Sequence, residues 1–585
     1  MAHQVNPNHE KPHKTIHQFG PGNVHFHGKS FDTHSDHSHH HTLRSLVRPP
    51  VVRQWIHLGK IHREHTDRVP SRLELFFDLV FVAIAHQLSD AVAENASAAG
   101  LAKFILIFYP TWSLWNEFRN FVNASGTDDV LQRLAVLWLM ALLVGYTANA
   151  SAIKLGSPSH ESTEAVSETV HAVARGVLAE VSAEPSTAGA EQGHLSHYAR
   201  DPALVTATAF FLVGKFSRVA FLMWYAFALP LFRSAFLLQT AYQMLNFFIY
   251  FPLLFVRSPR AIITLSALGL ATDYLLRYFL GVPLLVMNRI TKKYAKAGKR
   301  EDLEKASHGV DPTVNVCAYE KSREKMAPYI PATNIEHFIE RTAAFVVIVL
   351  GELVLSVVYH ATAAEVGFKS IYGSAICGLI IAFNFCWLYF DAECSHNFVH
   401  AMRRHWFTSI TFTNLHFPLC ASLILVSAAT SRMTQHIDEV TPAIRWYFSG
   451  GLGVALISMA LIGATHRGLD PTGTSMLGRT TQLAFRIAVG IIIICLPLAK
   501  NLTPLKVLGI SAGLTSFLVI EETYGKLRRG EPLAKPSGAE QDAIDAGLQR
   551  EHAEEAERAA RIESNGALST RSGSVESGLK EGKIQ

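Results

Sequence analysis

Long apolar blocks alternate with short polar stretches along most of this 585-residue chain. A helix needs about twenty consecutive apolar residues to cross a bilayer. Twelve blocks approach or exceed this length, at 73–92, 102–122, 130–151, 203–229, 234–256, 260–287, 338–360, 371–390, 406–429, 442–464, 481–499 and 504–522. Only a short turn containing Pro259 separates the fifth block from the sixth, so eleven spans would also fit. The pattern predicts an all-α polytopic membrane protein with about twelve transmembrane helices.

The distribution of basic residues among the loops predicts how these helices are oriented. Cytoplasmic loops of membrane proteins carry an excess of Lys and Arg. With twelve spans and a cytoplasmic N-terminus, three basic segments fall on the same side: the flank ending at Arg72, the loop "NRITKKYAKAGKR" and the late "GKLRRG". We therefore expect both termini in the cytoplasm.

Polar segments flank and interrupt the transmembrane region, which we place at 72–523. Residues 1–71 should form a largely disordered, His-rich cytoplasmic tail, and 524–585 a cytoplasmic tail with a helix of alternating charge. A Glu/Ala/Ser-rich insert at 152–202 falls outside the cytoplasm, and a basic loop at 289–335 falls inside it. The tail histidines could bind a metal weakly, but a poorly constrained, disordered tail is the favoured interpretation.

The composition agrees with a membrane protein and narrows its partners. Charged residues make up 17% of the chain, against about 25% in soluble domains, and the mean hydropathy is +0.18. The six cysteines are scattered without metal-ligand spacing, and a net charge of +5 does not indicate nucleic acid. The expected partners are the lipid bilayer and a small solute or ion.

The first span, 73–92, holds four titratable residues in an otherwise apolar sequence: Glu74, Asp78, His86 and Asp90. A charge at the bilayer centre costs roughly 2.5–3.5 kcal/mol. Glu74 and Asp90 lie near the span ends, where they could simply reach interfacial water. Asp78 and His86 lie deeper, and we expect them to face a polar cavity lined by protein. The alternative is a structural pair with another helix.

The seventh span repeats this unusual pattern. It carries Glu340 and Arg341 at its cytoplasmic end and Glu352 near the bilayer midplane. Glu352 follows Glu340 by twelve residues, the interval that also separates His86 from Glu74. A parallel repeat of six plus six helices would leave such a pattern, although two charged helices can share a spacing by chance.

Other ionisable residues lie within or beside the spans and could pair with these carboxylates. They are Arg119, Arg133, Lys215, Arg218, Asp273, Arg277, Asp391 and His416. A buried basic residue needs a carboxylate partner, and Asp78 and Glu352 are the deepest ones. Asp273 and Arg277 are one helical turn apart, which predicts an internal pair. On the alternative reading, all these charges only lock helices together.

Four strings occur in an order and spacing that resemble the low temperature requirement A family of membrane proteins. They are "RLELFFDLVFVAIAHQLSD", "HFIERTAAFVVIVLGELVLSV", "CWLYFD" and "NLHFPL". The resemblance covers roughly 68–430 and continues more weakly to 523. The insert, the enlarged loop and both tails depart from the family pattern, as expected of a eukaryotic, fungal-type member. The resemblance implies a protein grouped with transporters, but no established activity.

Together these observations predict a proton-linked transporter or channel for a small solute or ion. The residues expected to carry coupling are Glu74, Asp78, His86, Glu340, Arg341 and Glu352. The alternative is a non-transporting scaffold or cold-adaptation protein. The sequence offers no Ser/His/Asp arrangement, metal-ligand cluster or phosphate loop, so we expect no enzyme, metal site or cofactor. The host membrane should be the plasma membrane or an endomembrane; the oligomeric state is left open.

Overall fold

The computed structural model describes thirteen stretches of the chain. They are residues 24–26, 48–57, 60–64, 68, 70–94, 96–127, 129–153, 201–278, 329–361, 370–393, 398–435, 440–468 and 475–527. The predictions for the insert, the basic loop and the charged helix of the C-terminal tail concern residues that lie almost entirely outside these ranges.

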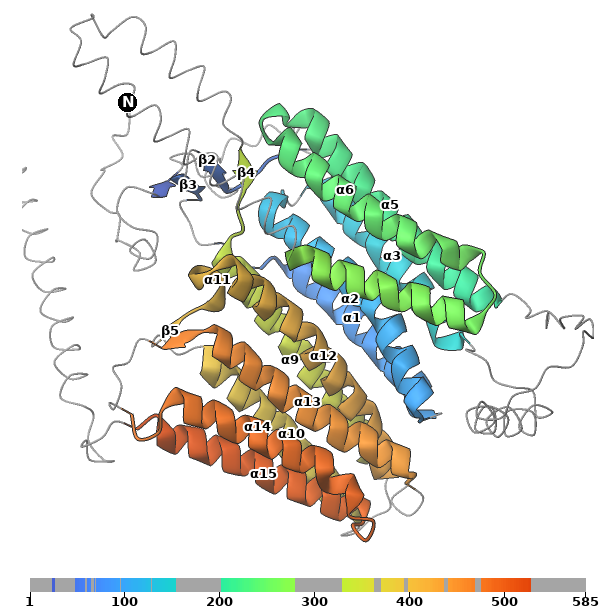
Figure 1. The fold of residues 1–585 in the computed structure, drawn as a ribbon, viewed down its shortest axis with the longest axis vertical. Helices are drawn as coiled ribbons and strands as arrows, with labels where there is room; N and C mark the ends of the chain where they lie inside the picture. The colour runs from blue at the N-terminus through green and yellow to red at the C-terminus, as the bar shows by residue number, and fades with distance from the viewer. Residues whose placement is uncertain are drawn as a thin grey trace, which may run out of the picture. The chain divides into compact units, whose positions relative to one another are not determined.

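Long helices account for nearly all described residues after residue 70 (Figure 1). They are α1 (Arg72–Glu94), α2 (Ala98–Ser125), α3 (Val130–Ala152), α5 (Pro202–Ala228), α6 (Arg233–Tyr250), a helix at 259–278, α9 (Ile335–Ala361), α10 (Ser370–Glu393), α12 (Trp406–Gln435), α13 (Pro442–Thr465), α14 (Arg479–Cys495) and α15 (Pro504–Gly525). Shorter elements are η3 (Pro230–Phe232), η4 (Phe251–Leu254), α11 (Ala401–Arg404) and η5 (Leu496–Leu498). Each apolar block recognised in the sequence therefore contains a helix.

Nine of the described helices are long and apolar enough to cross a membrane: α1, α3, α5, α9, α10, α12, α13, α14 and α15. Helices α2 and α6 and the helix at 259–278 are not among them, and for α2 its surroundings give the reason. Its residues 107–119 are all buried by protein, so this helix can carry polar side chains that lipid would not tolerate. The structure thus confirms a polytopic membrane protein.

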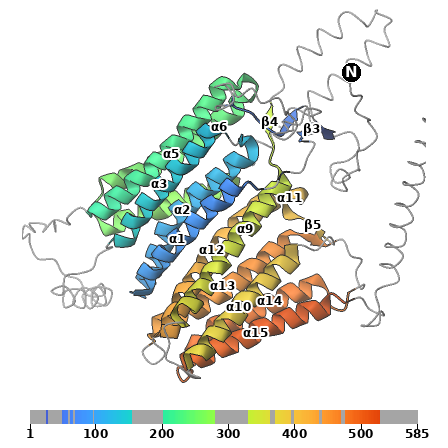
Figure 2. The ribbon, with the colours of Figure 1, turned by 180° about the vertical axis from the view of Figure 1, so that it is seen from behind.

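The helices form two sets that pack in the same order. In the first set α1 packs on α3, α3 on α5 and α5 on α6; in the second, α9 packs on α12, α12 on α13 and α13 on α14. Helices α1 and α2 meet α9 and α12 where the two sets join (Figure 2). This packing order fits the suggested six-plus-six repeat. The twelve-residue interval between charged residues, which first suggested the repeat, does not support it. Glu74 is buried whereas Glu340 is exposed, so the two residues do not occupy equivalent environments.

Two glycines let α13 and α14 approach closely. A Cβ atom added to Gly453 would lie 2.5 Å from the carbonyl oxygen of Gly490. Small residues at such crossings allow the backbones of membrane helices to come into contact. A side chain at Gly453 would therefore force the two helices apart.

A small sheet joins the N-terminal segment to the start of α9. Its strand order is β1 (Val24–Phe26), β3 (Lys60–Arg63), β2 (Trp55–His57), β4 (Ile330–Pro331), with β1 parallel to β3 and the other pairs antiparallel. A second sheet pairs β5 (Phe398–Val399) with β6 (Arg467–Gly468). Neither sheet was predictable from the sequence, because strands of two to four residues are too short to show a period. Part of the tail expected to be largely disordered is thus ordered, at 48–57 and 60–64.

The chain divides into two compact units. The first comprises residues 1–469 and 479–521, and the second residues 470–478 and 522–585. In the second unit, the backbone N–H of Met476 donates to the Leu527 carbonyl at 2.9 Å, and that of Leu477 to Gly525 at 3.1 Å. All sites described below lie in the first unit.

Candidate functional site

A cluster of buried charges joins α1 to α9 near the N-terminal ends of both helices. Arg341 Nη2 donates a hydrogen bond to Asp78 Oδ1 at 3.0 Å, while Nη1 lies 3.0 Å from Asp78 Oδ2. Trp115 Nε1 donates to the same Oδ1 at 2.8 Å. Asp78 and Arg341 are both 0% exposed. This paired geometry is the strong form of a carboxylate–guanidinium contact.

Glu74 completes this cluster from one turn earlier on α1. Its Oε2 lies 3.2 Å from His337 Nε2 and 3.5 Å from Arg341 Nε, and its Oε1 accepts from the Ser71 backbone N–H at 3.1 Å. Glu74 is 2% exposed, so the expectation that it reaches interfacial water is wrong. We call Glu74, Asp78, His337 and Arg341 the sealed cluster, because protein surrounds them and their charges are paired.

A second contact between α1 and α9 lies further along both helices. His86 Nδ1 is 2.6 Å from Glu352 Oε1, and His86 Nε2 is 3.2 Å from Asp90 Oδ2. The Glu352 side chain is 1% exposed, whereas those of His86 and Asp90 are 44% and 48% exposed. The imidazole thus connects a buried carboxylate of one helix set to the surface of the other.

A third group of charges joins α2, α5 and the helix at 259–278. Lys215 forms an ion pair with Glu117 and donates to Ser113 Oγ at 2.9 Å. Ser113 in turn donates to Asp273 Oδ2 at 2.8 Å, and Arg277 Nη2 lies 3.5 Å from the same oxygen. The predicted pair of Asp273 with Arg277 is therefore present. Lys215 is fully buried and Asp273 is 1% exposed.

Next to this group lies a cavity of about 390 Å³. It is lined by the C-terminal halves of α2 and α5, the N-terminal half of α6, Arg277, residues 330–333 and the first turns of α12. Its polar lining includes Asn116, Glu117, Arg218 and Gln243. None of the residues of the sealed cluster, nor His86 or Glu352, lines this cavity. The prediction that Asp78 faces a polar cavity is wrong, because its carboxylate is buried and accepts hydrogen bonds from Arg341 and Trp115.

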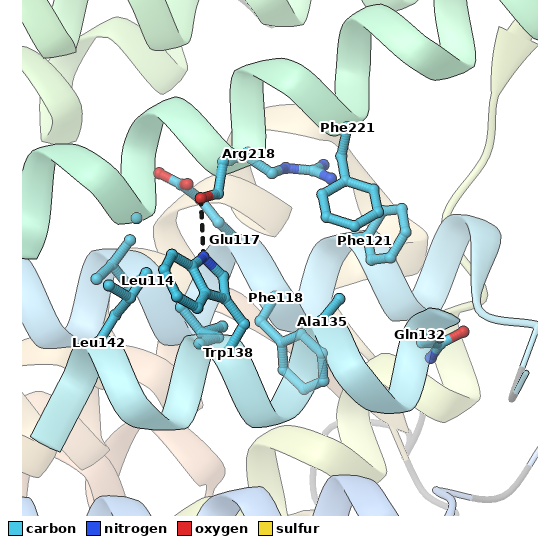
Figure 3. Close-up of a pocket in the computed structure, with 13 residues that line it drawn as sticks. Leu114, Glu117, Phe118, Phe121, Gln132, Ala135, Trp138, Leu142, Arg218 and Phe221 are labelled. Atoms are coloured by element: carbon cyan, nitrogen blue, oxygen red, sulfur yellow. Dashed lines mark hydrogen bonds between the residues drawn. The ribbon is translucent and has the colours of Figure 1, made fainter. Parts of the chain in front are cut away.

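Arg218, unlike Lys215 and Arg341, forms no ion pair among the described residues, and unlike Arg119 it lines the cavity (Figure 3). Its guanidinium carbon lies 4.9 Å from the centre of the Phe121 ring, and its buried Nε has no hydrogen-bond partner. No carboxylate among the described residues forms an ion pair with it. Arg218 and Glu117 also line a small, mostly apolar pocket of about 70 Å³ between α2, α3 and α5, where Trp138 Nε1 donates to Ser217 Oγ at 3.1 Å.

Arg119 does not pair with Asp78 or Glu352, as the sequence had suggested it could. It donates to Thr342 Oγ1 at 2.7 Å and to the Asn116 side chain, and its guanidinium carbon lies 3.9 Å from the centre of the Phe338 ring. The charge is 0% exposed. Neutral hydrogen-bond acceptors and a π face therefore hold it in place of a carboxylate.

The remaining candidates lie away from these groups. Arg133 and Glu340 are exposed on α3 and α9. His416 is buried in α12, where Nε2 lies 3.0 Å from the Tyr389 hydroxyl and Nδ1 lies 2.7 Å from the Phe412 carbonyl. The side chain of Asp391 lies outside the described part of the structure.

The sequence analysis did not single out Gln243 or Glu117 as site residues. Gln243 is 5% exposed, and its Oε1 has no hydrogen-bond partner. A signal was present, because Gln239, Gln243 and Asn246 recur at helical spacing in an otherwise apolar span. Polar side chains on one face of a membrane helix indicate a protein-facing or water-facing surface.

The apolar helices and the charges paired between them define a polytopic integral membrane protein. The family model described as "Bacterial low temperature requirement A protein (LtrA)" matches residues 69–519, and the chain belongs to this family. The match includes all three charged groups and all the residues that line the cavity. No curated protein matches the chain.

Proposed function

We propose that this LtrA-family protein is a transporter or channel that carries a small solute or ion through the cavity. The observation that supports this most strongly is a space of about 390 Å³ with charged and amide walls inside a helical bundle. At about 30 Å³ per water molecule, it has room for about a dozen waters or a small solute. Charged groups within membrane helices usually mark such paths.

We further propose twelve spans with both termini in the cytoplasm, in the plasma membrane or an endomembrane. In this topology the lining segments of α2, α5, α6 and α12 all lie toward the cytoplasm. The cavity would then be an inward-facing vestibule, closed toward the other side by the packed helices.

The proposed link to protons is the contact of His86 with Glu352. Histidine is the side chain that ordinarily gains and loses charge near neutral pH. Its imidazole joins α1 to α9, the first helices of the two sets, in the half of each helix opposite the vestibule. A change in its charge would change the attraction between the two sets, which could then rock against each other as transporters do.

This proposal is tested by proton flux into liposomes that contain the purified protein, at matched amounts and matched thermal stability. We expect Glu352→Gln and His86→Gln to abolish pH-driven flux. Glu94→Gln is the matched control. The Glu94 side chain lies on α1, as His86 does, is 65% exposed and lies 3.8 Å from Arg432 in a long ion pair. Undiminished flux in both His86→Gln and Glu352→Gln would contradict the proposed coupling.

The second candidate function is a scaffold without transport, in which buried charges only join helices. The sealed cluster favours this reading for its own residues, because Asp78 and Glu74 are held by partners on α2 and α9. A scaffold would show no flux of any solute, and every charge-removing substitution would act on stability alone.

A further inference from the structure

The charges around the cavity do not balance. Glu117 is paired with Lys215, and Arg277 is paired with Asp273. Arg218 forms no ion pair among the described residues, and the carboxylate whose charge acts on it, Glu117, is already paired with Lys215. The wall of the cavity therefore carries an excess positive charge in surroundings where water screens it poorly.

A second cation stands directly behind this wall. Arg119 is fully buried and donates to Asn116, which itself lines the cavity. The charges that line the cavity and their ion-pair partners are three cations, Lys215, Arg218 and Arg277, and two carboxylates, Glu117 and Asp273. A cleft with an excess of one sign of charge and apolar walls concentrates ions of the opposite sign.

Aromatic rings fix the position of the unpaired guanidinium. In Figure 3 the Arg218 side chain extends beside Phe121 and Phe221, and the Phe121 ring centre is 4.9 Å from its guanidinium carbon. Such stacking restrains the planar group without consuming its hydrogen-bond donors. The site thus has a cation that is held in position but has no carboxylate partner among the described residues.

We propose that the cavity selects small anions, either carboxylates or inorganic oxyanions, and that Arg218 is the residue that recognises them. Guanidinium groups match the planar, two-oxygen edge of such anions. As the substrate class of the transporter, this inference rests on the proposed function; the charge preference of the cavity is measurable without any transport.

The experiment measures this preference by cysteine modification of the full-length protein. Thr413, in the α12 part of the lining, is changed to Cys after the six native cysteines have been replaced. Reaction rates are compared for two thiol reagents of similar size, the anionic sulfonatoethyl and the cationic trimethylammonioethyl methanethiosulfonate. The anionic-to-cationic rate ratio is divided by that of a free thiol in solution, which removes intrinsic reactivity.

We expect a normalised ratio of about ten, which means that the anionic reagent is favoured about tenfold more at the Thr413→Cys thiol in the cavity than at a free thiol. Arg218→Gln should reduce it at least threefold, as expected for loss of the unpaired charge, and Arg218→Lys should retain most of it. Arg260→Gln removes an exposed arginine from the helix at 259–278 and should leave the ratio unchanged.

Three outcomes would overturn the inference: a normalised ratio of one or less, a normalised ratio that Arg218→Gln does not change, or no reaction with either reagent. The last result would mean that no solute reaches the cavity. Failure of the proposed transport has a different signature, because an anion-selective cavity with the expected ratio can exist in a protein that shows no flux.

Discussion

The sealed cluster and the cavity wall both place charges inside an apolar bundle. In the sealed cluster the charges are paired and buried, whereas the cavity wall contains a charge without an ion pair among the described residues. Asp78 accepts from Arg341 and Trp115 and is 0% exposed, so no solvent reaches it. Arg218 borders a cavity of about 390 Å³, rests on an aromatic ring and lacks a carboxylate among the described residues.

The difference separates charges that hold the fold from charges available to a ligand. Removing one partner of a buried ion pair is costly because the other charge is left uncompensated. An unpaired charge beside a cavity has no such partner to lose. Buried charge in a membrane helix therefore does not by itself indicate transport; the decisive feature is whether the charge is paired with an opposite charge or borders a cavity.

The largest expected effect is on stability, for Asp78→Asn. Arg341 would remain 0% exposed and lose its bidentate carboxylate, so we expect a loss of about 3–5 kcal/mol, measured as a fall in the thermal unfolding midpoint in detergent. Asp90→Asn, which removes a half-exposed carboxylate, should cost at most about 1 kcal/mol. The paired substitution Asp78→Leu with Arg341→Met should recover only part of the loss, because it takes Arg341 from Glu74 and the acceptor from Trp115 Nε1. Equal midpoints for Asp78→Asn and wild type would show that the sealed cluster does not hold the fold.

The next effect is a pH dependence of stability at a second closed site, where α11 meets the end of α13. Burial, followed by the neighbouring Arg403 charge, lowers the pKa of His400 to about 3. Burial, followed by His400, lowers the pKa of His466 to about 2. In the unfolded chain a histidine binds a proton below about pH 6.5, whereas in the folded protein these two histidines stay neutral there. The free energy of unfolding is therefore largest above about pH 6.5 and falls as the pH drops below it.

Each of these two histidines should contribute a loss of up to about 1.4 kcal/mol per pH unit below about pH 6.5. Thermal unfolding at pH 7.5 and pH 5.5 measures this loss. The double variant His400→Asn, His466→Asn should flatten the dependence, because an Asn oxygen can still accept the backbone N–H groups that the two Nδ1 atoms accept now. An unchanged slope in that variant would exclude these histidines as its source.

A smaller effect on stability and a larger one on flux are expected for Arg218→Gln. The substitution removes a ring contact but leaves no carboxylate stranded, so the free energy of unfolding should change by about 1 kcal/mol or less. Flux of small anions into proteoliposomes should fall about tenfold. A stability loss as large as that of Asp78→Asn would erase the distinction between the two regions.

The smallest stability effect is expected for Gln243→Leu. Its buried Oε1 has no hydrogen-bond partner to lose, so the change should be near neutral or slightly stabilising. The apolar side chain should still slow the passage of a polar solute through the cavity. Thermal unfolding and flux, measured on one preparation with the conservative Gln243→Asn as control, would reveal both effects; a clear loss of stability would mean that Gln243 has a structural partner.

The sequence indicated the helices and one local charge pair correctly, and it left the long-range partners open. The pair of Asp273 with Arg277 was predictable, because residues four apart share a helix face. The pair of Asp78 with Arg341 joins residues 263 positions apart, and no local pattern reveals it. Arg119, which its charge made a possible partner of a carboxylate, instead uses Thr342 and Asn116.

By itself, the sequence determined that this is a helical membrane protein of the LtrA family with an unusual number of charges in its spans. Helices follow from local hydrogen bonding and apolar block length, which are properties of neighbouring residues. Only the tertiary structure decided that Asp78 is sealed and that Arg218 borders a cavity. The reason is geometric: a charge is neutralised or left available according to which helices pack against it, and that packing joins segments far apart in the chain.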